Sequence, residues 1–230
     1  MNEEQVCFRS RISEHTFRHI IKLFCLDIEA SKIAEITGVS EHSLNKLFKA
    51  LRKRILELCE AEATCHESIF ECDESYFGPH RIRDIRGRGA KRKTIVFGIY
   101  DRRAQHVYLR IVSGVASKHL IPSIERIATK VSTIYTDAFS SYRCLKTLGY
   151  AAHEVVNHTD NEFAREEVHT NGIKNFWGLV KTSLTKRKGF REESLLLHLK
   201  ECEYRFNLEG EENMYHDLLQ NMRNLPLKFN

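Results

Sequence analysis

Carboxylates in the middle of a strand-like segment constrain this chain more than any other feature. Residues 70–78 read FECDESYFG, a short run of aromatic and cysteine side chains that carries acidic residues. Burying an unpaired charge costs several kcal/mol, so a packed strand seldom accepts a carboxylate without a use for it. The segment therefore predicts a strand that presents Asp73 at a functional site.

Two later segments supply partners for Asp73. Residues 134–137 form a second apolar strand that ends in Asp137, and residues 169–177 open a basic amphipathic helix. Acidic oxygens from two strands and a polar side chain from a helix can converge on a divalent cation. Sites of this kind catalyse phosphoryl transfer.

The composition is that of a globular intracellular protein. With 230 residues, of which 42% are hydrophobic, the chain suits one core domain of about 100–200 residues and a smaller one. No apolar run approaches the roughly 18–20 residues of a membrane span, and the N-terminus lacks the pattern of a signal peptide. We expect no membrane partner, and a location in the cytoplasm (on the nucleoid) of a bacterium or in the nucleus of a eukaryote. The seven cysteines form no C-x-x-C pair, which favours isolated thiols over a zinc ribbon or a disulfide framework.

Basic side chains gather beside the acidic segments. The net charge is only +5, but residues 81–93 hold seven lysines and arginines against one aspartate, and a second basic cluster spans 181–191. Such clusters neutralise phosphates and predict a track for DNA, with a merely solvated surface as the alternative for either cluster alone. The expected DNA contacts are Arg86, Arg88, Arg92, Lys93, Lys186, Arg187 and Lys188.

Residues 1–66 are expected to be helical and to bind DNA. A short helix with Ile33 and Ile36, a turn at Gly38 and a second helix capped by Ser40 have helix-turn-helix spacing. The second helix carries basic residues that would face the DNA, namely Lys46, Lys49, Arg52 and Lys53. An ordinary helical hairpin is the alternative interpretation.

From residue 68 the hydrophobic period changes from helical to alternating. Predicted strands cover 69–77, 94–100, 106–112, 132–136 and 151–156, and predicted helices cover 117–131, 139–148, 169 onward and 191–208. Three strands followed by alternating helices and strands indicate an α/β fold: a ribonuclease-H-like mixed sheet with flanking helices, preceded by the small all-α region. The predicted domains are 1–66 for DNA binding, 67–208 for catalysis and 209–230 as a C-terminal tail.

Several motifs also resemble a known family. Residues 71–78, RGRG at 86–89, YTD at 135–137, HTNGI at 169–173, NFW at 175–177 and KECEYRFN at 200–207 have the order and spacing typical of small insertion-sequence DDE transposases, in the group related to eukaryotic Merlin elements. The resemblance implies an enzyme that binds the terminal inverted repeats of its element, cleaves DNA with a pair of Mg²⁺ or Mn²⁺ ions and transfers the strand to target DNA. It also implies a homodimer or higher oligomer on double-stranded DNA.

The resemblance assigns roles to individual residues. Asp73 and Asp137 become the first two metal ligands, and Lys181 becomes the basic residue near the DNA phosphate. The third acidic position of the family is Lys174 here, and an ammonium group cannot ligate a cation. Asn171, one helical turn earlier, is the expected third ligand and catalytic residue. The alternatives are Glu162, Glu166 and Glu167.

Other interpretations stay open. The alternative interpretation of Asp73 is a structural acid in a strand. The alternative interpretation of Asp137 is a helix N-cap. Two alternative functions remain. One is a decayed or domesticated transposase that binds DNA without cutting it, and the other is a structure-specific nuclease that cuts DNA without strand transfer. Glu74 is expected to be structural, because alternation along the strand sends its side chain to the face opposite Asp73.

Overall fold

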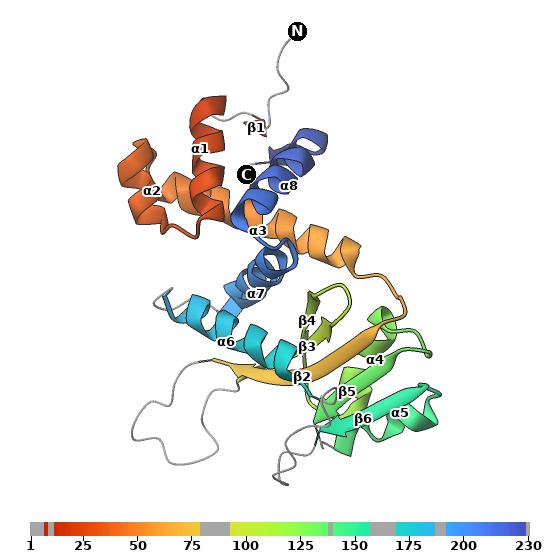
Figure 1. Ribbon diagram of the computed structural model, residues 1–230. Coiled ribbons are helices and arrows are strands. Elements are labelled where there is room, and N and C mark those ends of the chain that lie inside the picture. The colour runs from red at the N-terminus through yellow and green to blue at the C-terminus, as the bar shows by residue number, and fades with distance from the viewer. Residues whose placement is uncertain are drawn as a thin grey trace, which may run out of the picture. The chain divides into compact units, whose positions relative to one another are not determined.

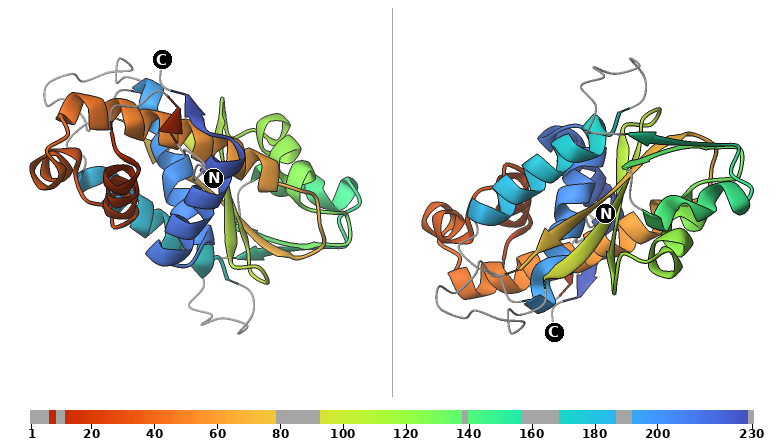
Figure 2. Two further views of the ribbon diagram at one scale, coloured as in Figure 1. Left: turned by 90° about the horizontal axis from the view of Figure 1, so that it is seen from above. Right: turned by 90° about the horizontal axis from the view of Figure 1, so that it is seen from below.

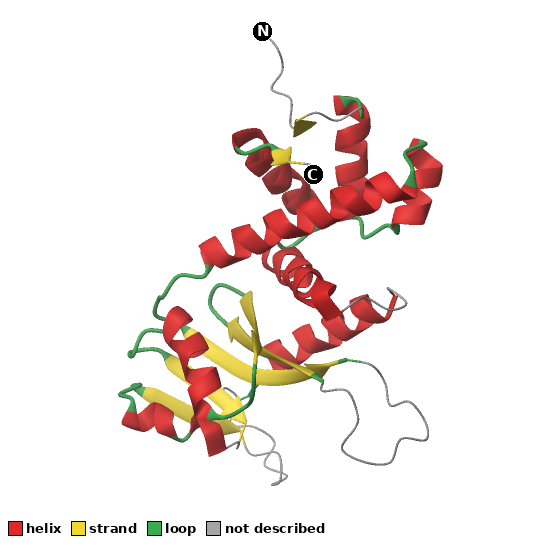
Figure 3. Cartoon of the chain, turned by 180° about the vertical axis from the view of Figure 1, so that it is seen from behind, coloured by secondary structure: helices red, strands yellow, loops and turns green. Residues whose placement is uncertain are grey.

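The computed structural model describes residues 7–8, 12–78, 93–137, 140–156, 169–186 and 192–228. These residues divide into two compact units. One unit combines Met1–Glu60 with Lys200–Asn230, and the other comprises Ala61–Leu199. The first is built mainly from helices and the second combines a sheet with helices (Figure 3). No helix in the described ranges is long and apolar enough to cross a bilayer.

The second unit contains a mixed sheet of five strands. They are β2 (Ile69–Phe77), β3 (Thr94–Asp101), β4 (His106–Val112), β5 (Thr133–Asp137) and β6 (Ala152–Val156). Their spatial order is β4-β3-β2-β5-β6. Strands β2, β3 and β4 pair antiparallel, whereas β2, β5 and β6 pair parallel. A meander continued by parallel strands is the arrangement predicted from the sequence, and the ribonuclease-H-like fold class is confirmed.

Helices cover both faces of this sheet (Figures 1 and 2). On one face α4 (Ser117–Ile127), a 3-10 turn (Ser140–Tyr142) and α5 (Cys144–Thr147) pack over an apolar cluster that includes Phe70 and Cys72 of β2. On the other face lies α6 (Asn171–Lys186). Because side chains alternate along a strand, Glu71 and Asp73 point toward the face that carries α6.

Helix α6 approaches β3 so closely that two positions accept only glycine. A Cβ atom added to Gly98 would lie 2.6 Å from Cζ2 of Trp177 and 2.8 Å from Cδ1 of Ile173. A Cβ atom added to Gly172 would lie 2.2 Å from Cε1 of Tyr100. The backbone of each element therefore rests directly on aromatic side chains of the other, which leaves α6 little freedom to shift along the sheet.

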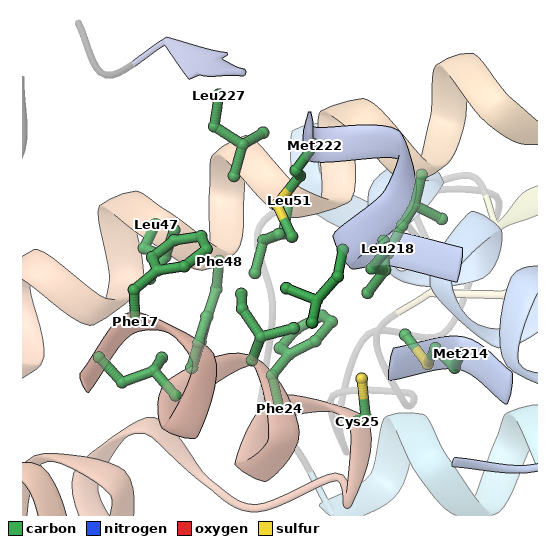
Figure 4. Packing of buried hydrophobic residues seen from close by; sticks show 14 of the residues in the cluster. Phe17, Phe24, Cys25, Leu47, Phe48, Leu51, Met214, Leu218, Met222 and Leu227 are labelled. Carbon is green, nitrogen blue, oxygen red and sulfur yellow. The ribbon is translucent and has the colours of Figure 1, made fainter. Parts of the chain in front are cut away.

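The first unit packs its helices around one core, and it also contains two short strands. Its elements are β1 (Cys7–Phe8), α1 (Glu14–Cys25), α2 (Ala30–Thr37), α3 (Glu41–Glu62), the second half of α7 (Glu192–Asn207), α8 (Glu211–Asn224) and β7 (Leu227–Lys228). Strands β1 and β7 pair parallel. Figure 4 shows Phe17, Phe24, Phe48, Leu218 and Met222 meeting in the core.

The structure divides the chain differently from the predicted boundaries at the C-terminus. Residues 209–230, expected as a tail, contain helix α8, and they share a compact unit with residues 1–60. The reason is an apolar face at helical spacing: Met214, Leu218 and Met222 are buried. Smaller differences concern two helices, since α4 ends at Ile127 rather than 131 and the expected helix 139–148 is a 3-10 turn plus a single helical turn.

The helices α2 and α3 are joined as the sequence predicts. Gly38 ends α2 in the left-handed conformation, with φ of 71°, which glycine adopts without strain. Ser40 then caps α3, because its Oγ accepts the backbone N–H of Ser43 at 3.3 Å.

Candidate active site

Asp73 and Asp137 come from neighbouring strands of the sheet. Strands β2 and β5 run parallel, with Glu71 opposite Tyr135 as the last registered pair. Two residues further along each strand stand Asp73 and Asp137, at the same level of the sheet. On its other side Asp73 pairs with Gly98 of β3, the position on which Trp177 of α6 rests.

The electrostatics of Asp73 indicate a pair of close carboxylates. Burial raises the pKa of the Asp73 carboxyl, and the Asp137 carboxylate raises it further, whereas Lys174 lowers it. Like charges disfavour joint ionisation, and a cation placed between them removes that penalty. The two aspartates thus form a site that a positive charge would stabilise.

Glu74 takes no part in this pair, in agreement with the expectation from strand alternation. Its carboxylate accepts a hydrogen bond from Tyr142 Oη at 2.6 Å, on the face covered by α4 and α5. Burial raises the pKa of Glu74 to about 7, and the charges of Asp137 and Asp73 add to the effect. Glu74 is therefore a structural carboxyl group bonded to a buried tyrosine.

The polar side of α6 carries the positions expected near the metal. Asn171, Lys174, Asn175 and Gly178 are all exposed, whereas the intervening positions Ile173, Phe176 and Trp177 are buried. Lys174 lies close enough to Asp73 to lower the pKa of that carboxyl. Lys181, two turns further along the helix, is also exposed. The alternatives Glu162, Glu166 and Glu167 lie outside the described residues.

Trp177 marks the buried side of the site. Its ring packs 5.9 Å from Phe77 and 5.6 Å from Phe176, centroid to centroid. Its Nε1–H is buried and has no hydrogen-bond acceptor within the described ranges, yet it lies near enough to Asp73 to lower the pKa of that carboxyl. The indole N–H is therefore one more positive pole beside the Asp73 carboxylate.

The sequence predicted no role for Glu71 of β2. In the structure its carboxylate contacts the first turn of α6. The Glu71 carboxylate is 1% exposed. It accepts hydrogen bonds from Arg102 Nε at 2.7 Å and from the backbone N–H of Ile173 at 3.0 Å. The signal in the sequence was the alternation that puts Glu71 and Asp73 on one face. The partners, 31 and 102 residues away, carried no visible signal.

The candidate DNA contacts fall into three groups. Lys46, Lys49, Lys53 and Lys93 are exposed. Arg52 is not available in the same way, because its guanidinium pairs with buried Glu201 at 2.6 Å and lies over the Phe24 and Phe48 rings. We therefore correct the expectation for Arg52 to a structural role. The positions Arg86, Arg88, Arg92, Arg187 and Lys188 lie outside the described residues, as does the side chain of Lys186.

The residues present suit a hard divalent cation. Mg²⁺ and Mn²⁺ prefer carboxylate and carbonyl oxygens, and Asp73 and Asp137 supply mutually repelling carboxylates. No group of three or more His, Cys, Asp or Glu side chains able to hold a metal occurs within the described ranges.

The strand order of the sheet and the two aspartates on the neighbouring strands β2 and β5 are those expected for a domain of the ribonuclease-H-like class. Within this class the comparison with known families is specific: residues 67–207 match the ISXO2-like transposase domain. The chain belongs to this family of transposases.

The chain is also similar to individual proteins. An uncharacterized transposase-like protein of Haemophilus influenzae is 41% identical over 101 residues, which cover 44% of this chain and 80% of the relative. An uncharacterized protein in transposable element ISH50 of Halobacterium salinarum is 25% identical over 169 residues, covering 66% of this chain and 57% of the relative. Among solved structures, a pre-cleavage Mos1 transpososome matches with 12% identity and a TM-score of 0.36, over 96% of this chain and 82% of that chain.

Proposed function

We propose that the protein is a DNA transposase that binds the terminal inverted repeats of its element, cleaves DNA with Mg²⁺ or Mn²⁺ and joins the 3′ ends to target DNA. The observation that carries the proposal is the placement of Asp73 and Asp137 at one level of the neighbouring strands β2 and β5, inside the region that matches the transposase family. The proposal includes assembly as a dimer or higher oligomer on DNA, a location with the genome, and kinship with the group that contains the Merlin elements.

The chain's own groups have defined tasks in this reaction. Asp73 and Asp137 would hold the proposed pair of ions. When bound, these ions would activate the oxygen nucleophile and neutralise charge on the leaving oxygen. Exposed Lys181 on α6 would bind a phosphate of the strand that is cut. Trp177 fills the space behind Asp73 and keeps water from that side of the carboxylate.

The identity of the third metal ligand distinguishes an active transposase from the main alternative function. Asn171 stands at the first position of α6, on the same exposed side as Lys174, and an amide oxygen can complete a magnesium site. Lys174, by contrast, brings positive charge next to Asp73, where a cation should bind. This observation favours the rival function, a transposase-derived protein that binds DNA but no longer cuts it.

Exchanging Lys174 for glutamate is expected to raise metal-dependent nicking of repeat-end DNA about tenfold. A carboxylate there adds a ligand and removes a repelling charge, which is worth at least about 1.4 kcal/mol. In the same assay Asn171→Ala should abolish the activity of the parent protein. Lys118→Glu is the control, since it makes the same charge change at an exposed position of α4, on the other face of the sheet. Nicking by Lys174→Glu equal to the parent, together with unimpaired Asn171→Ala, would reject both positions as the third ligand.

DNA binding by the first unit is the other part of the proposal. The exposed residues Lys46, Lys49 and Lys53 recur along one side of α3, the second helix of the helix-turn-helix arrangement. Replacing all three with glutamine is expected to weaken binding and to lower the slope of log K against log salt by about 2 to 3, because each lost phosphate contact contributes about 0.9. Binding is measured by fluorescence anisotropy between 50 and 200 mM salt. Glu41→Gln serves as a control at the start of the same helix. A salt slope equal to that of the parent would show that α3 does not contact phosphates.

A further inference from the structure

A buried carboxylate beside the site connects β2 to the first turn of α6. Glu71 stands two residues before Asp73, so both side chains point to the same face of the sheet. Its two oxygens are engaged separately: Oε1 accepts from Arg102 Nε at 2.7 Å and Oε2 accepts the N–H of Ile173 at 3.0 Å. The first N–H groups of a helix lack partners within the helix, and a carboxylate at this position also interacts favourably with the helix dipole.

Arg102 extends this connection to the segment that leads into α6. Its Nη2 donates to the carbonyl oxygen of His169 at 2.5 Å and to His169 Nδ1 at 3.0 Å. The backbone N–H of Asn171 also points at Nδ1, at 3.4 Å. Since two donors face Nδ1, this nitrogen is an acceptor, and its 3.4 Å approach to Glu71 Oε1 is not an ion pair. The guanidinium of Arg102 lies over the Tyr135 ring, 4.3 Å from its centroid.

These contacts fix α6 at its first turn, and the glycine contacts fix it along its side. Tyr100 lies against Gly172, and Trp177 and Ile173 lie against Gly98, the register partner of Asp73. The polar residues Asn171 and Lys174 belong to the same first turn. The distance of Asn171 and Lys174 from Asp73 therefore depends on where the Glu71 contacts hold the first turn of α6.

We propose that Glu71 is a positioning residue, which with Arg102 and His169 forms a clamp that sets the place of Asn171 and Lys174 relative to Asp73. Both carboxylate oxygens of Glu71 are engaged by Arg102 and Ile173, so Glu71 would act through the position of α6. The effect of this clamp on DNA cleavage rests on the proposed function. The effect of the clamp on the position of α6 does not.

The seating is tested by hydrogen exchange and by the fluorescence of Trp177, the only tryptophan of the chain. Glu71→Gln keeps the size of the side chain and removes its charge. Amides of the first turn of α6, Ile173 above all, are expected to exchange at least about tenfold faster in this variant, because a hydrogen bond to a charged group is lost. Quenching of Trp177 by acrylamide should rise as well.

The matched control is Glu203→Gln. Glu203 is also 1% exposed, and its carboxylate pairs with Lys200 Nζ at 2.9 Å in the first unit. This variant should lose stability without faster exchange in the first turn of α6. If Glu71→Gln does not fold, Arg102→Lys takes its place, since it keeps the charge and removes the forked contact with His169.

Cleavage supplies the second measurement. With saturating repeat-end DNA and Mn²⁺, Glu71→Gln is expected to lower kcat at least about tenfold, while Kd for DNA stays within about twofold, since small displacements of reacting groups are costly. Exchange and quenching equal to the parent would overturn the clamp. Faster exchange with an unchanged kcat would overturn its role in the reaction. A parent without cleavage activity whose exchange responds as expected supports the clamp and counts against the proposed function.

Discussion

Replacing Asp73 or Asp137 with asparagine is expected to reduce metal-dependent nicking of repeat-end DNA by about 1,000-fold. Each change removes one negative charge from the pair that would hold the cation, and metal stabilisation of a phosphoryl-transfer transition state is worth several kcal/mol, of which about 4 corresponds to this factor. Asparagine has nearly the shape of aspartate, so the packing of β2 and β5 should persist.

The measurement is single-turnover nicking at saturating DNA, with DNA affinity determined in parallel. Affinity should stay within about threefold, because the basic groups that bind phosphates are unchanged. Glu154→Gln provides a control, since Glu154 is an exposed carboxylate of the neighbouring strand β6 outside the site. Activity of either aspartate variant within about tenfold of the parent would argue that the pair does not bind the catalytic metal.

Removing the charge of Glu201 is expected to cause the largest loss of stability in the first unit, about 3 kcal/mol. Its carboxylate is 1% exposed and accepts hydrogen bonds from Arg52 Nε at 2.6 Å and Arg205 Nη2 at 2.9 Å. Arg205 also donates to the carbonyl oxygens of Phe24 and Cys25, at 2.7 and 2.6 Å, and so caps the end of α1. Glu201→Gln leaves two largely buried guanidinium groups without their counterion.

Urea unfolding followed by circular dichroism measures this loss. Glu57→Gln is the matched control, because Glu57 pairs with Arg54 at 3.0 Å on the same unit but its side chain is 65% exposed. Exposed pairs contribute at most about 1 kcal/mol, so this control should unfold almost like the parent. Equal unfolding free energies for the Glu201 and Glu57 variants would show that the buried network does not hold the unit together.

Much of the sheet was predictable because its strands carry local signals. Alternation of apolar and polar residues predicted strand 106–112 with the bounds observed for β4, and the apolar run with acidic residues predicted β2 over 69–77. The neighbouring placement of Asp73 and Asp137 followed from strand order alone, since a parallel β2–β5 pair brings two late strand positions to one level of the sheet.

Features that depend on distant contacts were not predictable. Helix α8 begins after Gly210, which offers no capping side chain. Its apolar residues are buried because they pack with residues of α1 and α3, and the sequence gives no sign of this contact. Arg52 looked like one more base on a DNA-binding helix until its contact with Glu201, 149 residues away, was seen. Glu71 received no role from the sequence because its partners Arg102 and Ile173 lie 31 and 102 residues away.

The central claim is that Asp73 and Asp137 together bind the divalent ion used for DNA cleavage. Binding of Mn²⁺, followed by electron paramagnetic resonance in the presence of repeat-end DNA, tests this claim even in a protein that cuts slowly. The account predicts saturable binding by the parent protein and at least about tenfold weaker binding by each of Asp73→Asn and Asp137→Asn, because each loses a charged oxygen ligand. Mn²⁺ affinity that is the same in the parent and in both variants would contradict it.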